Sequence, residues 1–258
     1  MYYIVEENTF NEKGHARLLE TLDRFSIPYE VIKVKPFIEE LEFETDRKDV
    51  FCFGSVKMSR LAKKYNWNPG ALMTKNHNFL VYRNHYHEDL LNYDSRILQF
   101  GEDFPWTQSH YFIRPCEDTK TFAGQVFDLQ DWFAFWHGAQ DANFKGYGSL
   151  DLSTLIQVAP VKLVQKEYRL WIVDGKIVTA SLYKMNNRPL FCSKIEPDAL
   201  KFGTKMIEKF ELADAFVMDV CLHKDEWKIV ECGCINSAGF YEADMQMLVN
   251  ALEKKFKQ

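Results

Sequence analysis

Short apolar runs alternate with longer amphipathic stretches through the first hundred residues. The runs predict strands over residues 2–5, 29–34 and 50–53, and apolar positions spaced three or four apart predict helices over 14–25 and after residue 55. A strand, helix, strand, strand, helix order is typical of an open α/β unit with a mainly parallel sheet. We therefore expect the chain to begin with such a unit.

The periodic pattern loosens from Asp94 to Pro105, where polar residues, Gly and Pro take over. We place a domain boundary there, with a first domain over 1–97 and a second over 98–258. The second domain begins with predicted strands over 111–115 and 155–161 and a helix over 131–140. Pro160 lies in one of these strands, so that strand is expected at an edge or at a change of course.

Two hairpins are predicted in the last third of the chain. Asp174-Gly175 joins apolar runs over 168–173 and 176–181, which is a strong hairpin signal. A polar turn from Leu222 to Glu226 joins a second pair of strands. Helices are predicted over 198–210 and along a stripe of apolar residues from Met245 to Phe256.

The second hairpin carries one acid on each of its apolar strands. Asp219 lies on the first strand and Glu231 on the second, and Asn236 follows before a Gly that permits a tight bend. Carboxylates on core strands are costly unless something compensates their charge. Two acids and an amide oxygen are ligands that Mg²⁺ takes, with substrate phosphates completing its coordination. An ordinary hairpin with solvent-facing acids is the alternative.

Composition excludes several classes of function. The chain has 258 residues, 47% of them hydrophobic and 27% charged, with a net charge of −5, so no nucleic-acid surface is implied. No apolar run approaches the roughly 20 residues of a membrane span. Six dispersed cysteines and the absence of a signal-peptide pattern favour a reduced, cytoplasmic protein. Cys232 and Cys234 could form half of a zinc site, but no second pair with matching spacing is present.

Other polar residues suit anion binding less specifically. Arg114 ends one predicted strand and Lys120 follows a short polar loop, a pair that suits phosphate oxygens unless both are exposed beside Glu117 and Asp118. Gly54-Ser55 could receive an anion, although a tight turn between strand and helix is the favoured interpretation. His85-Tyr86-His87 is interpreted as a strand with a solvent-facing His pair rather than a metal site.

Together these segments resemble the ATP-grasp superfamily, and specifically a divergent clade of small ATP-grasp proteins from bacteria and phages. The resemblance covers nearly the whole chain. The motifs that carry it are Arg114-Pro115 with Lys120-x-Phe122-x-Gly124, Ala159-Pro160-Val161, Glu167-Tyr168-Arg169 before Trp171-Ile172-Val173-Asp174-Gly175, and the segment from Asp219 through Glu231 to Asn236-Ser237-Ala238-Gly239-Phe240-Tyr241. One departure is Gly233, where the usual Glu-x-Asn pattern requires Asn; Asn236 or a water could replace that amide.

The resemblance implies an N-terminal pre-ATP-grasp-like α/β domain followed by a two-lobed α+β ATP-grasp domain. The small lobe would cover about 105–160 and the large lobe about 161–258. ATP and Mg²⁺ are the implied cofactors. The implied roles are catalysis for Arg169, metal binding for Asp219, Glu231 and Asn236, and ATP binding for Arg114, Lys120, Ala159, Pro160, Val161 and Glu167.

The implied activity is that of a carboxylate–amine ligase acting through an acyl phosphate, on small-molecule or peptide carboxylate and amine substrates. An ATP-binding assembly or regulatory protein and a kinase-like phosphoryl transferase are the alternatives. Neither substrate and no oligomeric state can be read from the residues. An exposed strand Arg paired with a neighbouring acid is the alternative for Arg169.

Overall fold

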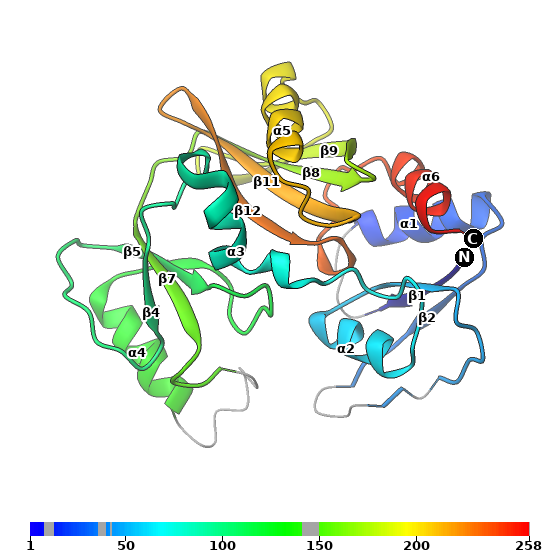
Figure 1. Cartoon of the computed structure of the whole chain (residues 1–258), viewed down its shortest axis with the longest axis horizontal. Coiled ribbons are helices and arrows are strands. Elements are labelled where there is room, and N and C mark those ends of the chain that lie inside the picture. The colour runs from blue at the N-terminus through cyan, green and yellow to red at the C-terminus, as the bar shows by residue number, and fades with distance from the viewer. Residues whose placement is uncertain (8–12, 36–39, 42, 141–149, 258) are drawn as a thin grey trace.

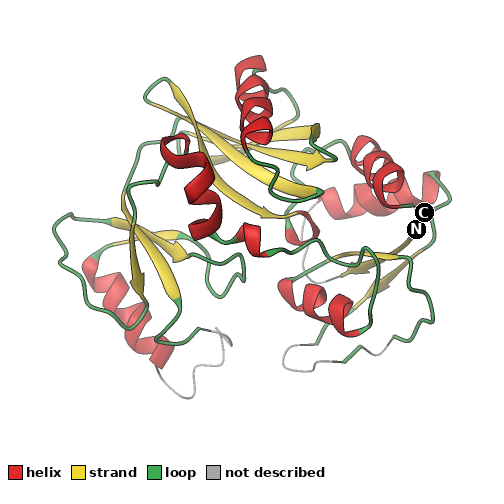
Figure 2. Cartoon of the chain, in the orientation of Figure 1, coloured by secondary structure: helices red, strands yellow, loops and turns green. Residues whose placement is uncertain are grey.

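The computed structural model describes residues 1–7, 13–35, 40–41, 43–140 and 150–257, which form a mixed α/β protein with three sheets (Figures 1 and 2). The first sheet has the strand order β2-β1-β3 and is parallel throughout, as predicted. Its unit consists of β1 (Tyr2–Glu6), α1 (Lys13–Arg24), β2 (Tyr29–Ile32), β3 (Val50–Phe53) and α2 (Val56–Lys64).

The second sheet is antiparallel, with the strand order β4-β7-β5-β6. Its strands and its helix are β4 (Arg96–Gln99), β5 (Tyr111–Pro115), β6 (Gln125–Phe127), α4 (Leu129–Gln140) and β7 (Leu155–Pro160). Trp132 of α4 packs edge to face against Phe100 and Phe127, which holds the helix on this sheet.

The third sheet has the order β10-β9-β8-β11-β12 and is antiparallel. It is formed by β8 (Lys166–Val173), β9 (Lys176–Met185), β10 (Arg188–Cys192), β11 (Ala215–His223) and β12 (Glu226–Cys234), with α5 (Pro197–Lys209), η4 (Ile235–Ser237) and α6 (Met245–Phe256). Both predicted hairpins are confirmed. Asp174 and Gly175 have φ of 52° and 67°, the left-handed pair that a two-residue hairpin turn requires.

Alternate residues of β8 face two different cores. Leu170 and Ile172 pack with α5 and with α3 (Phe79–Tyr86) on one face of the large sheet. Trp171 and Val173 pack on the other face with α1, α6 and the N-terminal sheet. Because both faces of the sheet are covered, polar residues in its middle strands are held by protein on either side.

Two local predictions were wrong. Residues 85–87 lie in α3 and in the 3-10 turn η2 (His87–Asp89) rather than in a strand. The Asn78 side chain accepts a hydrogen bond from Leu80 N at 2.9 Å and so caps α3, a signal that outweighs the aromatic strand composition. The polar stretch from Asp94 to Pro105 contains β4, which pairs with β7. The boundary between residues 97 and 98 therefore falls within β4, and the division into domains stays a prediction.

No helix among the described residues is long and apolar enough to cross a membrane.

We expect Gly14→Ala to lower the free energy of unfolding by about 1–3 kcal/mol, the cost of overpacking. A Cβ at position 14 would lie 2.6 Å from the Cβ of Phe240, so α1 and the C-terminal segment could not keep their present contact. Gly138→Ala in α4 is the matched control, because a Cβ there meets nothing within 4 Å. It should stabilise the helix by up to about 1 kcal/mol. Urea unfolding of both variants checks this, and equal stability would contradict the packing argument.

Candidate active site

Three charged residues lie directly opposite one another across the middle of the large sheet. Asp219 of β11 pairs in register with Arg169 of β8 on one side and with Glu231 of β12 on the other. Residues directly opposite in adjacent strands point to the same face of the sheet. The strand pairing therefore gathers Arg169, Asp219 and Glu231, which are far apart in sequence, into one row.

A β-bulge sets the direction of Glu231. The register shifts between Asp219, which is opposite Glu231, and Val220, which is opposite Ile229, so Val230 is the extra residue. Ile229 and Cys232 consequently both face the core that contains α3. Without the bulge, strict alternation would send Glu231 to that core face.

Arg169 and Asp219 form a bidentate ion pair. Nε and one terminal nitrogen of Arg169 each donate to a carboxylate oxygen of Asp219 at 2.8 Å. Arg169 and Asp219 are 9% and 2% exposed. Burial raises the pKa of Asp219 to about 6, although Arg169 acts in the opposite direction.

Arg169 has four further neighbours that fix its guanidinium plane. Its remaining nitrogen donates to the Gly239 carbonyl at 3.3 Å, and a terminal nitrogen lies 3.8 Å from Glu231. The guanidinium carbon lies 5.0 Å from the ring centroid of Tyr241 and 5.7 Å from that of Tyr183. Arg169 is thus held by a rigid sheet and by aromatic rings, not exposed at the surface.

Glu231 is the point where the two lobes meet electrostatically. Arg114, at the end of β5 in the small sheet, donates to Glu231. Burial raises the pKa of the Glu231 carboxyl, but Arg114, Arg169 and Lys120 outweigh burial and hold that pKa below its ordinary value. Lys120 donates to the Ser237 carbonyl at 2.6 Å and is therefore also drawn toward the large lobe.

Asp118 was missed by sequence reasoning, which took it as part of an exposed loop. Its side chain is only 9% exposed and accepts from Cys234 N at 2.8 Å, which joins the loop after β5 to β12. Burial raises the pKa of Asp118, with Lys120 acting against it. A Cβ at Gly233 would lie 3.3 Å from Asp118 Oδ2, so this carboxylate lies directly beside the position where the family pattern has Asn. The available signal was the alternation of buried Cys116 and Asp118 around exposed Glu117.

A cavity of about 960 Å³ opens between the small and large sheets. Pro160 and Val161, where the chain passes from β7 toward β8, line it together with Glu167 and Lys184. Glu167 accepts from Tyr183 Oη at 2.6 Å and pairs with Lys184 at 2.9 Å. Ala159 does not line this cavity, because its side chain is buried within the small sheet.

The cavity leads toward the charged row. Phe112 and Val230 both line it, and these residues are close in sequence to Arg114 and Glu231. Phe112 and Arg114 lie two residues apart on β5 and so share a face of the sheet. The cavity and the charged row are therefore adjoining parts of one interlobe region.

Asn236 lies apart from the two acids in its contacts. Its amide nitrogen donates to the carbonyls of Cys52 at 2.6 Å and Gly70 at 3.2 Å, and its oxygen accepts from Leu72 N at 2.8 Å. These bonds fasten the end of β12 to the N-terminal sheet. Metal binding by Asn236 stays a prediction, and it would require at least the bond from Leu72 to be shared.

The remaining candidates have ordinary structural roles. Ser55 N donates to Glu6 at 2.6 Å, so the Gly54-Ser55 turn already binds a carboxylate of the chain. His85 stacks on Phe210 with ring centroids 3.7 Å apart. All six cysteines are free. The described part of the chain contains no group of three or more His, Cys, Asp or Glu that could hold a metal.

A family model for an ATP-grasp domain, family 3 of its clade, matches residues 54–252, which is most of the chain. A search of the curated proteins gives no match.

Solved structures with the same fold include three ligases or synthetases. D-alanine–D-alanine ligase from Bacillus anthracis complexed with ATP is 11% identical with a TM-score of 0.61, and covers 99% of this chain and 97% of that one. D-cycloserine synthetase DcsG is 12% identical with a TM-score of 0.58, covering 98% of both chains. The ATP-grasp ligase PsnB complexed with minimal precursor is 11% identical with a TM-score of 0.55, also covering 98% of both. At these identities the similarity establishes the fold alone.

We expect Asp219→Asn to lower the free energy of unfolding by about 3 kcal/mol, because it leaves the Arg169 guanidinium buried without its counter-charge. Glu226→Gln is the control, because it removes a carboxylate from an exposed pair with Lys228 and should leave the unfolding midpoint nearly unchanged. Equal midpoints for the two variants in urea unfolding would contradict this role for the buried pair.

Proposed function

The chain belongs to the ATP-grasp superfamily, and from that premise we propose that it is an ATP-dependent carboxylate–amine ligase. The observation that carries the proposal is the row of Arg169, Asp219 and Glu231 beside the interlobe cavity. Buried charges on core strands are rare in the absence of a functional reason, and clusters of them with shifted pKa values are typical of active sites.

We infer that the cavity receives the base and ribose of ATP. Its volume of about 960 Å³ lies in the range of small-molecule sites, and it is mostly apolar with a few polar groups. Pro160 and Val161 would contact the base, and the Glu167–Lys184 pair supplies the polar groups beside it. The phosphates would then lie toward Arg114, Lys120 and Arg169. Ala159 would contribute only through its backbone.

Asp219 and Glu231 fit Mg²⁺ as ligands. Both are carboxylates, and magnesium is commonly bound by one or two carboxylates plus substrate phosphates, so two acids suffice. When bound, the metal would neutralise charge on the phosphates during transfer. Gly233 supplies no side chain, and Asp118 is the nearest further carboxylate beside that position.

The proposed reaction has two steps. A carboxylate oxygen of the acceptor attacks the γ-phosphorus, the bond between that phosphorus and the β,γ-bridging oxygen breaks, and ADP leaves with the electron pair. An amine nitrogen then attacks the acyl carbon, the carbon–oxygen bond to phosphate breaks, and the nitrogen loses a proton. Arg169, Arg114 and Lys120 would stabilise the negative charge on the phosphoryl oxygens, and no side-chain nucleophile is needed.

A second candidate is a nucleotide-binding protein that does not ligate. Gly233 and the engaged side chain of Asn236 favour it, because they leave two carboxylates as the main metal ligands. A kinase-like transferase would stop at the phosphorylated acceptor. ADP release that requires both a carboxylate and an amine separates the ligase from both of these.

Arg169→Lys should lower the rate of ADP release far more than it weakens ATP binding. Lysine keeps the charge but loses the planar fork that pairs with Asp219 and faces the reacting phosphoryl group. An interaction made mainly in the transition state affects turnover rather than binding. Calorimetric ATP titration and an ADP-release assay on the same preparation check this. Equal losses of binding and turnover would instead assign Arg169 to nucleotide recognition, and no loss of either would remove it from the site.

Glu231→Gln should abolish metal-dependent turnover and weaken Mn²⁺ binding measured by electron paramagnetic resonance in the presence of ATP. The amide removes the charge that attracts the metal, while Arg114 and Arg169 remain close to the side chain. Circular dichroism should show an unchanged fold. Parent-like Mn²⁺ affinity together with parent-like turnover would overturn the metal assignment.

A further inference from the structure

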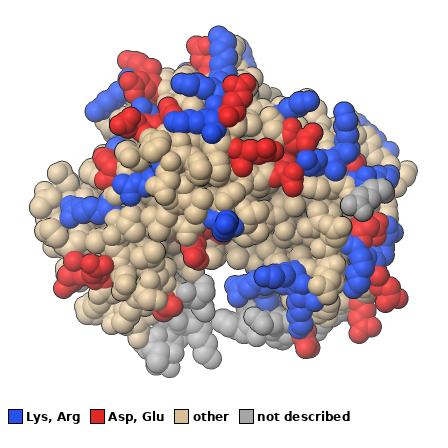
Figure 3. Space-filling view, in the orientation of Figure 1, with Lys and Arg blue, Asp and Glu red and all other residues tan. Residues whose placement is uncertain are grey.

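A second cavity, of about 800 Å³, lies between α2 and the loop that leads from β5 to Lys120. The 3-10 turn η1 (Lys75–His77) and the start of α3 form its third side. It shares no lining residue with the interlobe cavity. Figure 3 shows Lys and Arg side chains gathered over α2, beside the notch that separates α2 from the small lobe.

The walls of this cavity carry opposite charges. Arg60 and Lys63 on α2, with Lys75 on η1, line one part, and Glu117 with Asp118 lines another. Among the described residues Arg60, Lys63 and Lys75 make no ion pair, so their charges are available to a ligand. A simple anion would satisfy the cations but not the acids. A ligand with both a carboxylate and an ammonium group would complement both walls.

Two buried polar groups in the wall have no partner within the described structure. One is Oγ of Ser59 and the other is Nε2 of His77, whose side chain is 2% exposed. His77 Nδ1 accepts a hydrogen bond from Thr74 N at 3.1 Å, so the proton of the neutral ring is on Nε2. Burial lowers the pKa of His77 and so favours the neutral ring, although Asp118 opposes this. The cavity wall thus contains an unused N–H donor, which costs free energy unless an acceptor meets it.

The acidic wall is the part nearest to the proposed phosphoryl site. Asp118 is bonded to Cys234 N on β12, three residues beyond Glu231, and Lys120 follows it by two residues. A ligand amine held by Glu117 and Asp118 would therefore lie on the side of the cavity that faces the transferring phosphoryl group. Its carboxylate would lie toward Arg60 and Lys63.

We propose that this cavity binds an amino acid or short peptide with a free amine and a free carboxylate, with the amine toward Glu117 and Asp118. Assigning this ligand as the amine substrate rests on the proposed ligase function, whereas its binding does not.

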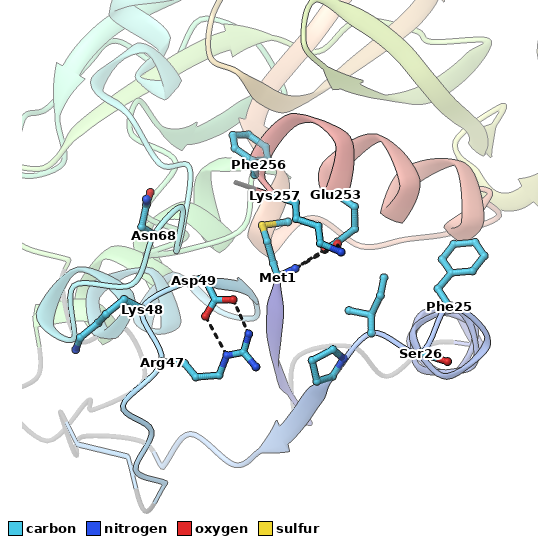
Figure 4. A pocket seen from close by; sticks show the side chains of 12 residues that line it. Met1, Phe25, Ser26, Arg47, Lys48, Asp49, Asn68, Glu253, Phe256 and Lys257 are labelled. Carbon is cyan, nitrogen blue, oxygen red and sulfur yellow. Dashed lines mark hydrogen bonds and ion pairs between the residues drawn. The ribbon is translucent and has the colours of Figure 1, made fainter.

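A smaller cavity of about 480 Å³ carries no such inference. It lies where α6 meets the start of β1 (Figure 4), and its charged groups already pair with one another. The amino group of Met1 bonds Glu253 at 3.1 Å, and Arg47 Nε bonds Asp49 at 2.9 Å.

The test uses the full chain and a mixture of free amino acids and glycine-containing dipeptides, each compared with its N-acetylated and its C-terminally amidated form. Saturation-transfer NMR identifies the binders, and calorimetry gives their affinities. We expect the doubly charged forms to bind and both capped forms to bind about tenfold more weakly or worse, the loss of one charge-assisted hydrogen bond. Equal binding of free and capped forms, or no binding of any free form at millimolar concentration, would overturn the proposal.

Charge-neutral variants assign each end of the ligand. Arg60→Gln with Lys63→Gln should remove the preference for a free carboxylate, and Glu117→Gln should weaken the preference for a free amine. The matched control is Lys57→Gln with Lys64→Gln, which makes the same charge change on α2 at residues outside the cavity lining. Equal losses in the two double variants would overturn the assignment.

ADP release separates this proposal from the ligase proposal. Binding of the free forms without any effect on ADP release, whatever carboxylate is supplied, would count against the ligase and leave the binding site standing. Amine-dependent ADP release that is unchanged in the Arg60 and Lys63 variant would support the ligase and overturn the site.

Discussion

The bidentate pair of Arg169 and Asp219 is the interaction on which the rest of the site depends. Both groups are almost completely buried in the middle of a sheet that is covered on both faces. Neither charge could remain there alone, since an isolated buried ion costs several kcal/mol. Once they are paired, the guanidinium plane is fixed, and its edge lies 3.8 Å from Glu231. The positions of Glu231 and, through it, of Arg114 in the other lobe follow from this arrangement.

Much of the fold could be predicted because local patterns and turn chemistry agree with it. The parallel N-terminal sheet follows from apolar runs separated by amphipathic helices, and the two hairpins follow from their turn residues. The candidate residues Arg169, Asp219 and Glu231 could be found because a charged residue in an apolar strand stands out in the sequence. Their meeting in one row could not be derived from spacing, because it depends on which strands pair and in which register.

The features that were missed arise from tertiary contacts. The bulge at Val230 has no Gly or Pro to mark it, yet it decides which face Glu231 occupies. Asp118 looks like an ordinary loop acid until the loop is folded against Cys234 N. His77 is a single His in a polar stretch, and only the cap formed with Thr74 N reveals which of its nitrogens carries the proton. In each case the decisive partner lies outside the local pattern or is a backbone group, which a residue sequence does not display.

The charges of the interlobe region balance within the chain, and this balance constrains how a nucleotide could enter. Arg114, Lys120 and Arg169 face Asp118, Asp219 and Glu231, so three cations meet three carboxylates. A nucleotide alone would add negative charge that competes with these acids for the same cations. With Mg²⁺ the exchange is close to even, because the metal would take Glu231 and Asp219 while the phosphates take the cations that those acids release. The same pairs that keep the buried carboxylates satisfied would therefore make nucleotide binding depend on the metal, which is the behaviour expected of a site whose ligands are held ready by mutual pairing.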